Sequence, residues 1–396
     1  MNATSRSRLR RPVNLFLDLL KSEQASGVLL VLCTAISLIL TNSSTGPAYT
    51  AIWHHHLPGG SVEYWINDGL MAIFFLMVGL ELEREVYIGE LSTRSKAMLP
   101  ALAALGGMLV PAGIHLFFNH GLPTQSGAGI PMATDIAFAI GILSLLGDRV
   151  PFSLKVFLTA LAVIDDLGAI VVIALFYSGG LQWAWLGGAA GIFAVLLLLN
   201  RLRVHVLLPY LVLGVGMWYC MLHSGVHATI SGVLLAFAIP FGDGSPGTIS
   251  SKLQHFLHRP VAFGIMPLFA LANTCLVLEP HWYEHLWTAN GWGIFLGLVV
   301  GKPVGVLLFC GVAIFTGLCT LPNGLSWKKF AGAGALAGIG FTMSIFITML
   351  AFEDAEHITS SKTTILVAST VAAIIGYSWL RLTLPHLPKQ SANEAG

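Results

Sequence analysis

Charge is what this chain has least of. Only 10% of its 396 residues are charged, while 55% are hydrophobic and the mean hydropathy is +0.79. Ordinary soluble domains carry about 25% charged residues, so this chain has too little polar material to cover the surface of a soluble globule. The formal net charge is +1 and no basic patch with interleaved aromatic residues occurs, which excludes nucleic acid as a partner.

Cysteine pairs and nucleotide-binding motifs are also missing. The five cysteines stand singly, without a CxxC pair, so neither a disulfide framework nor a zinc site is indicated. No ATP-binding motif occurs, and we expect no resident cofactor. Arginines at residues 6–11 precede an apolar run at 28–40 without a clear small-residue cleavage site, so we interpret this run as a retained first span.

Long apolar runs are what the chain has in abundance. A helix needs about 20 residues to cross the roughly 30 Å hydrocarbon layer, and runs of that length recur along nearly the whole sequence. A β-barrel would instead show short alternating segments, whereas 189–199 is apolar on every face. We therefore predict an all-α polytopic membrane protein with about twelve spans, at 24–41, 65–84, 97–118, 125–146, 151–177, 182–200, 207–222, 225–240, 259–278, 292–312, 329–351 and 362–384.

The placement of Lys and Arg supports this division. With twelve spans, all of the 20 basic residues except Lys302 and Lys362 fall on one side of the membrane. Basic residues favour the cytoplasmic side, so both termini are predicted to be cytoplasmic. No soluble domain interrupts the series. We expect one membrane-embedded transporter domain over 1–396, with a cytoplasmic N-terminus at 1–23, an interfacial helix at 12–23, and a cytoplasmic tail at 385–396.

The loop at 42–64 contains three successive histidines, His54, His55 and His56. Three neighbouring side chains of a regular helix or strand cannot converge on one ion, so a polar loop is the better interpretation than a metal site.

Four charged residues fall well inside the spans: Asp135, Asp165, Asp166 and Lys302. A charge at mid-bilayer costs at least roughly 2.5–3.5 kcal/mol, so such residues usually face partners or water and carry function. A purely structural ion-pair network is the alternative, but three carboxylates do not balance one lysine. Neighbouring helical residues differ by about 100° of rotation, so Asp165 and Asp166 should have different partners.

Two spans contain residues that interrupt helices. Pro131, Thr134 and Gly141 surround Asp135, and a glycine-rich run that includes Gly338 and Gly340 leads up to Phe341 and Thr342. These fourth and eleventh spans run in opposite directions, as an inverted repeat requires. Paired interrupted helices indicate a transporter's mid-membrane site, although membrane glycines also serve plain close packing.

Several motifs then match one family in order. The chain resembles the bacterial NhaA sodium/proton antiporters from about residue 12 to 384. That family is one of the cases on which the rule of paired interrupted helices is based, so the two arguments are not independent. The matching motifs are ATDIAFAIG at 133–141, ALAVIDDLGAI at 160–170, SGVHATISGV at 224–233, GKPVG at 301–305 and GIGFTMSIF at 338–346.

The resemblance implies roles for the buried charges. Asp165 and Asp166 would form the sodium and proton site, with Thr134 and Asp135 at the crossing of two broken helices and Lys302 facing them. Asp135 would compensate the positive N-terminal ends of half-helices, and Lys302 the negative C-terminal ends.

The resemblance also implies a pH-responsive cluster at the cytoplasmic mouth, formed by Glu81, Glu85, His255 and His258. Gln254 stands where well-known members have an acidic residue, so the pH response is expected to be altered. For the histidines alone, exposed loop positions are the commoner explanation. His227 is expected to help helix packing rather than to titrate.

Together these features predict an electrogenic, pH-regulated antiporter that extrudes Na+, and by resemblance Li+, in exchange for protons across the bacterial inner membrane. A buried carboxylate can hold a proton or a small cation, but not both well at once, and this competition would couple the two fluxes. A sodium-coupled solute symporter and an intramembrane aspartyl protease are the alternatives, but core polar groups are sparse and the Gly-x-Gly-Asp signature of the proteases is missing. The sequence leaves the oligomeric state open, with a homodimer as one alternative.

Overall fold

The computed structural model describes residues 23–278, 280–321 and 324–384. The predicted interfacial helix at 12–23 lies almost entirely outside these residues, as does the tail at 385–396. The first half of the chain forms α2 (Glu23–Thr41), α3 (Gly46–His54), β1 (His56–Leu57), β2 (Gly60–Ser61), α4 (Val62–Tyr64), η1 (Trp65–Leu70), α5 (Met71–Tyr87), α6 (Arg94–Asn119), η2 (Pro123–Met132), α7 (Ile136–Ser144), η3 (Gly147–Arg149), α8 (Phe152–Phe176) and α9 (Trp183–Arg201).

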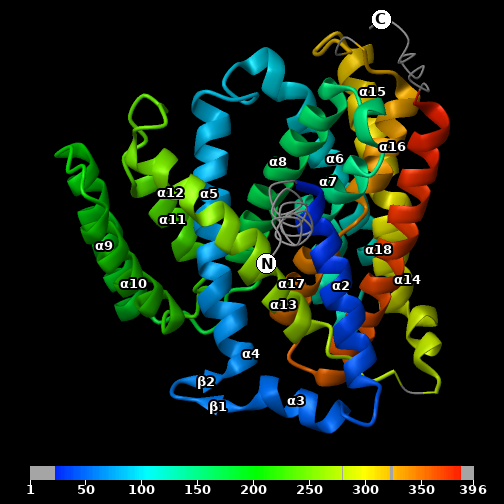
Figure 1. Cartoon of the computed structure of the whole chain (residues 1–396), viewed down its shortest axis with the longest axis horizontal. Coiled ribbons are helices and arrows are strands. Elements are labelled where there is room, and N and C mark those ends of the chain that lie inside the picture. Colours follow the sequence, from blue (N-terminus) through cyan, green and yellow to red (C-terminus); the bar gives the residue numbers. More distant parts are fainter. Residues whose placement is uncertain (1–22, 279, 322–323, 385–396) are drawn as a thin grey trace, which may run out of the picture.

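The second half is also helical (Figure 1). It contains α10 (Leu207–Leu222), α11 (Ile230–Ala238), α12 (Ile249–Pro260), η4 (Val261–Ile265), α13 (Met266–Asn273), η5 (Trp282–Trp287), α14 (Ala289–Leu296), η6 (Gly297–Gly301), α15 (Lys302–Phe315), α16 (Trp327–Ala337), α17 (Phe341–Ala351) and α18 (Ala355–Thr383). The elements η1, η4 and η6 are π-helical turns inside longer helices, whereas η2, η3 and η5 are 3₁₀-helical.

The predicted series of about twelve spans agrees with this architecture. Among the described residues, 6 helices are long and apolar enough to cross a membrane, or 9 if each bent helix pair is one span. The remaining predicted spans correspond to α10, to α11 and to the continuous helical segment from α12 to α13. The fold class is therefore an all-α polytopic membrane protein, as the apolar runs predicted.

Three predicted segments differ from the structure in detail. The span predicted at 225–240 has helix only from Ile230, because Gly225 adopts a φ of 82° and turns the chain first. The span predicted at 259–278 lies in a helical segment that already begins at Ile249, where the Thr248 side chain caps the backbone. The segment at 42–64 is not simply a polar loop, because it forms α3 and the β1–β2 hairpin.

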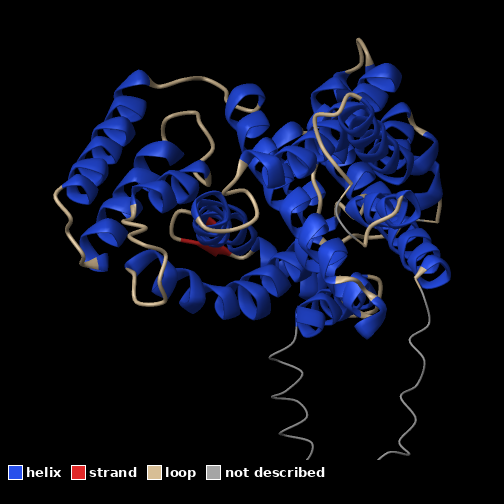
Figure 2. Ribbon diagram, turned by 90° about the horizontal axis from the view of Figure 1, so that it is seen from above, coloured by secondary structure: helices blue, strands red, loops and turns tan. Residues whose placement is uncertain are grey.

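The helices form two lobes (Figure 2). We call α6–α8 with α14–α18 the core bundle, and α2–α5 with α9–α13 the scaffold bundle, from the contacts that the helices make; α2 also packs against α7 of the core bundle. The core bundle contains both interrupted helices. Because Gly106 on α6 and Gly305 on α15 lack side chains, the two backbones touch, and this close approach brings Lys302 beside Gly107.

Candidate functional site

The two interrupted helices meet at their breaks. The helix pair η2–α7 bends by 42° and the pair α16–α17 by 46°. Gly338 ends α16 and Gly340 precedes α17, and the backbone amide of Asp135 donates to the carbonyl of Ile339 at 2.7 Å. The breaks predicted from Pro131 and from the glycine run are therefore present, and a hydrogen bond joins them.

Asp135 lies where two helices begin. Its Oδ1 accepts from the Phe138 amide of α7 at 3.0 Å, and its Oδ2 accepts from the Thr342 amide of α17 at 3.2 Å and from the Thr342 hydroxyl. Unpaired amides and the helix dipole make such ends positive. The carboxylate is buried, and it stabilises both helix starts at once.

Thr134 connects the break to Asp165. Its hydroxyl lies 2.6 Å from Asp165 Oδ2 and 2.8 Å from the carbonyl of Ala337, the last residue of α16. A hydroxyl has one proton, so it can donate to only one of these oxygens at a time. If Asp165 is ionised, Thr134 can donate to it; if Asp165 is protonated, Thr134 can accept from it and donate to Ala337.

Lys302 pairs with Asp165 and not with Asp166. The Lys302 ammonium donates to Asp165 Oδ2, and both side chains are completely buried. The resemblance assigned to Lys302 the compensation of the negative C-terminal ends of half-helices. In the described residues Lys302 donates to Asp165, and the hydroxyl that contacts the C-terminal end of α16 is that of Thr134.

Each of the two adjacent carboxylates keeps one oxygen without a partner. Asp165 Oδ1 and Asp166 Oδ1 are buried and accept no hydrogen bond from the described residues. A buried acceptor normally has a donor, so an orphaned carboxylate oxygen is suited to a proton or a cation. Asp165 contacts Thr134 and Lys302, whereas Asp166 lines a cavity, so the two side chains have different surroundings.

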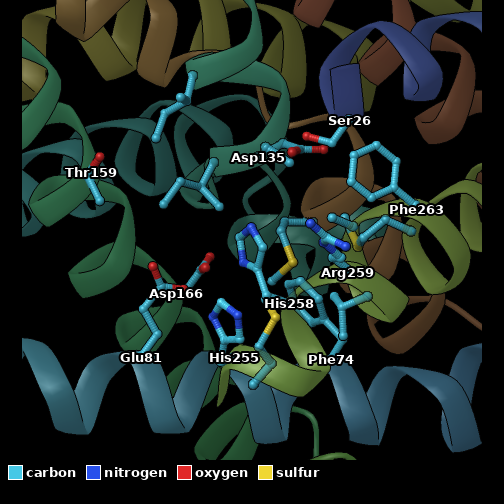
Figure 3. A pocket seen from close by; sticks show the side chains of 18 residues that line it. Ser26, Phe74, Glu81, Asp135, Thr159, Asp166, His255, His258, Arg259 and Phe263 are labelled. Atoms are coloured by element: carbon cyan, nitrogen blue, oxygen red, sulfur yellow. The ribbon is translucent and has the colours of Figure 1, made fainter. Parts of the chain in front are cut away.

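A cavity of ≈ 340 Å³ reaches Asp166. Its lining includes Asp135, Thr159 and Asp166, together with Glu81 from α5 and His255 and His258 from α12 (Figure 3). Both histidines are exposed, so the cavity opens beside them. They lie on a helix rather than on the exposed loop that was the commoner expectation.

Glu85 is the one residue of the predicted cluster that does not line this cavity. Its Oε2 accepts from the backbone amide of Glu90 at 2.9 Å. Gln254 is half-buried and is also absent from the cavity lining. The structure therefore brings together Glu81, His255 and His258, but not Glu85.

Sequence reasoning missed several polar residues near the site. Arg259 lines the cavity beside His258, although it was assigned only to the basic side of the membrane. Glu83 is buried with Ser250 Oγ at 3.5 Å from its Oε2. Because Glu83 is two residues from Glu81, the two side chains lie on different faces of the helix, and this spacing is the sequence signal that their surroundings differ. His227 lies 3.7 Å from Asp68 and packs against Phe346, in keeping with a packing role.

Among the described residues, no group of three or more His, Cys, Asp or Glu side chains could hold a metal ion in the usual way. His54 instead lies 3.5 Å from Glu63. A cation at Asp165 and Asp166 would be transported cargo and would need hydroxyl, carbonyl or water oxygens beside the carboxylates.

Known proteins share this architecture. The family profile for Na+/H+ antiporter 1 matches residues 17–380. The Na(+)/H(+) antiporter NhaA of Cytophaga hutchinsonii is 60% identical over 370 residues, which cover 93% of this chain and 96% of the relative. The protein of the same name from Flavobacterium psychrophilum is 58% identical, over 96% of this chain and 99% of the relative.

A solved structure is similar at the level of the fold. The sodium proton antiporter MjNhaP1 from Methanocaldococcus jannaschii superposes with a TM-score of 0.52 and 18% identity, over 91% of this chain and 92% of that chain. The family match and the identity of its relatives are the stronger findings. With them, the motifs around Asp135, Asp165 and Lys302 make this chain a member of the Na+/H+ antiporter 1 family.

Proposed function

We propose that this secondary Na+/H+ antiporter exchanges its two ions at one shared site, formed by Asp165 and Asp166. The observation that carries the proposal is the pair of buried, unpartnered Oδ1 atoms, one on each carboxylate. Asp166 also lines the open cavity, which provides a route for a hydrated ion. Family membership makes the chain a transporter rather than an enzyme.

Competition for the carboxylates couples the fluxes. Protons and Na+ bind the same oxygens, so a carboxylate that loses Na+ on one side of the membrane can take protons there and release them on the other. Lys302 takes part because it can neutralise Asp165 only while that acid is ionised. Thr134 can satisfy both protonation states of Asp165, by donating to it or by accepting from it.

The exchange is electrogenic in this proposal. Two carboxylates can release two protons for each Na+ bound, which moves net charge in every cycle. An imposed membrane potential, negative on the side to which protons move, should then accelerate exchange. A potential without effect on the rate would argue for one proton per Na+.

We propose that 1–396 forms one transporter domain in the bacterial inner membrane, with both termini and the cavity mouth on the cytoplasmic side. The one-sided distribution of Lys and Arg supports this orientation. Tags at each terminus, tested for protease access in intact and permeabilised cells, would decide it.

Glu81, His255 and His258 are proposed to tune the pH response, because they line the same cavity as Asp166. Glu85 could act there only indirectly. Li+ is proposed as a second cargo, since a small cation suits the same oxygen ligands. The oligomeric state stays open between a monomer and a homodimer in the bilayer, which light scattering of the purified protein would separate.

The direct test of the shared site is exchange by purified protein in liposomes, measured as Na+-driven proton flux. Asp166→Asn should abolish the flux, because an amide neither binds a proton nor supplies a charged ligand for Na+. Asp148→Asn is a matched control, since Asp148 is exposed and lies outside the cavity. Normal flux in Asp166→Asn would refute the assignment.

A further inference from the structure

A second buried lysine lies far from Asp165. Lys362 is 6% exposed and lies two turns into α18, in the core bundle. Its ammonium lies 3.3 Å from Asn273 Oδ1 and 3.9 Å from Glu63 Oε1. A buried charge needs polar partners, and both of these belong to the scaffold bundle.

The scaffold residues form a polar cluster of their own, made of Glu63, Asn67 and Asn273. Asn273, at the end of α13, donates to Asn67 Oδ1 at 2.7 Å, and Asn67 lies in the π-helical turn η1. The other carboxylate oxygen of Glu63 lies 3.5 Å from His54. Glu63, Asn67 and Asn273 thus belong to one bundle, and Lys362 reaches Glu63 and Asn273 from the other.

The neighbours of Lys362 on α18 behave differently. Ser361 accepts from Asn290 of α14 at 2.8 Å, inside the core bundle. The hydroxyls of Thr363 and Thr364 donate to carbonyls of their own helix. Among these neighbours, Lys362 is the side chain whose polar contacts cross between the bundles.

The polar cluster and the cavity mouth lie at opposite ends of the same scaffold helices. Along the segment from α12 to α13, His255 lines the mouth and Asn273 belongs to the polar cluster. The 18 helical residues between them span roughly 27 Å. On the segment from η1 to α5, Asn67 and Glu81 have the same arrangement. In this structure the mouth is open, and Lys362 contacts the scaffold bundle at the opposite end.

From this arrangement we infer that Lys362 with Glu63, Asn67 and Asn273 is a latch, which holds the two bundles together on the side opposite the cavity and must separate once in every transport cycle. The inference rests on the alternating exposure in the proposed function. Within that mechanism, Lys362 is a positioning residue: it touches neither the cation nor Asp165, and it acts on the relation between the bundles.

A reversible bridge across the latch tests this separation. The variant Glu63→Cys with Lys362→Cys, in a background without the five native cysteines, would be bridged by a short bis-methanethiosulfonate reagent in proteoliposomes. We expect Na+-driven proton flux to stop on bridging and to return after reduction. A long bridge, which permits separation, should leave the flux at its unbridged level.

The control bridge joins two positions of one bundle at the same end. Ser126 of η2 donates to the carbonyl of Ala351 in α17 at 3.0 Å, so Ser126→Cys with Ala351→Cys gives a bridge inside the core bundle. This bridge should leave the flux intact. If the short bridge between positions 63 and 362 is equally harmless, the latch is a static ion pair and the inference is wrong. Flux before bridging shows whether the variant still exchanges ions, so that a failure of antiport is distinguished from a failure of the latch.

A measurement of the distance between the two bundles tests the latch even if the double cysteine variant does not transport before bridging. Spin labels at Ser126 in the core bundle and Ile52 in the scaffold bundle occupy exposed positions that are not part of the latch. With Lys362→Gln, we expect a longer-distance population to grow, whereas Lys362→Arg should resemble the parent. Identical distributions for Lys362→Gln and the parent would overturn the inference, whatever the transport activity.

Discussion

Two buried lysines occupy opposite situations in this antiporter. Lys302 is fully buried and pairs with Asp165 inside the core bundle, beside Thr134 and the helix breaks. Lys362 is almost as buried but meets Glu63 and Asn273 of the scaffold bundle. The first pair can change when a proton or cation arrives, without movement between bundles. The second changes when the bundles move. In our proposal the same residue type therefore serves ion exchange in one region and the position of the bundles in the other.

Among the predicted changes, removal of Lys302 should have the largest effect on stability and on ion exchange. Lys302→Ala leaves Asp165 buried without its cation, and a broken buried pair costs roughly 3–5 kcal/mol in globular proteins. We expect a clear fall in the melting temperature together with loss of exchange at neutral pH. Fluorescence thermal unfolding and proteoliposome flux would measure both. Full stability with full activity would remove Lys302 from the site.

Thr134 should matter less than Lys302. Thr134→Val removes the hydroxyl between Asp165 and Ala337, and a buried acceptor left without its donor costs about 1–3 kcal/mol. Because the ionised form of Asp165 loses a donor, the apparent KM for Na+ should rise while the protein still reaches the membrane. Thr134→Ser keeps the hydroxyl and should retain the parent KM. Equal KM values in both variants would show that the hydroxyl has no part in binding.

Lys362 should separate stability from transport. The Lys362–Glu63 distance is 3.9 Å and Glu63 is partly exposed, so Lys362→Gln should lower stability by roughly 1 kcal/mol or less. The amide can still bond to Asn273. Transport should nevertheless change, since the two bundles are held less tightly. If Lys362→Gln lowered stability as much as Lys302→Ala and left transport unchanged, Lys362 would be a structural residue and not a latch.

The smallest expected effect concerns Gln254, which lies one turn from His258 on α12. A carboxylate there would favour the imidazolium of His255 and His258, so these side chains would keep their protons to higher pH. Gln254→Glu should therefore move the activation profile toward alkaline pH, measured as rate against pH at saturating Na+. An unchanged profile, also in His255→Ala with His258→Ala, would leave competition at Asp165 and Asp166 as the sufficient cause.

Much of the fold followed from composition, and the site only in part. Apolar runs predict spanning helices because lipid requires internally bonded backbone, and Pro131 and Gly338 marked the two breaks. The register of short helices did not follow: the turn at Gly225 and the cap at Thr248 shift two spans by several residues. The helix and hairpin at 46–61 were not predicted, because the segment 42–64 was interpreted as a polar loop.

Contacts between distant segments were beyond the sequence. Spacing along one helix predicted that Asp165 and Asp166 diverge, but it gave no partner for either. Asn273 falls inside the predicted span 259–278 without any signal of its own, and its contact with Lys362 depends on how the two bundles meet. Glu83 is similar, since its burial against Ser250 requires α12 to pack on α5.

The central claim is that Na+ and protons compete for Asp165 and Asp166. The most direct measurement is calorimetric titration of the purified protein with Na+ in buffers of different ionisation enthalpy, which counts the protons released on binding. We predict proton release by the parent protein, and neither binding nor release by the variant Asp165→Asn with Asp166→Asn. Na+ binding with undiminished proton release in that double variant would contradict the account.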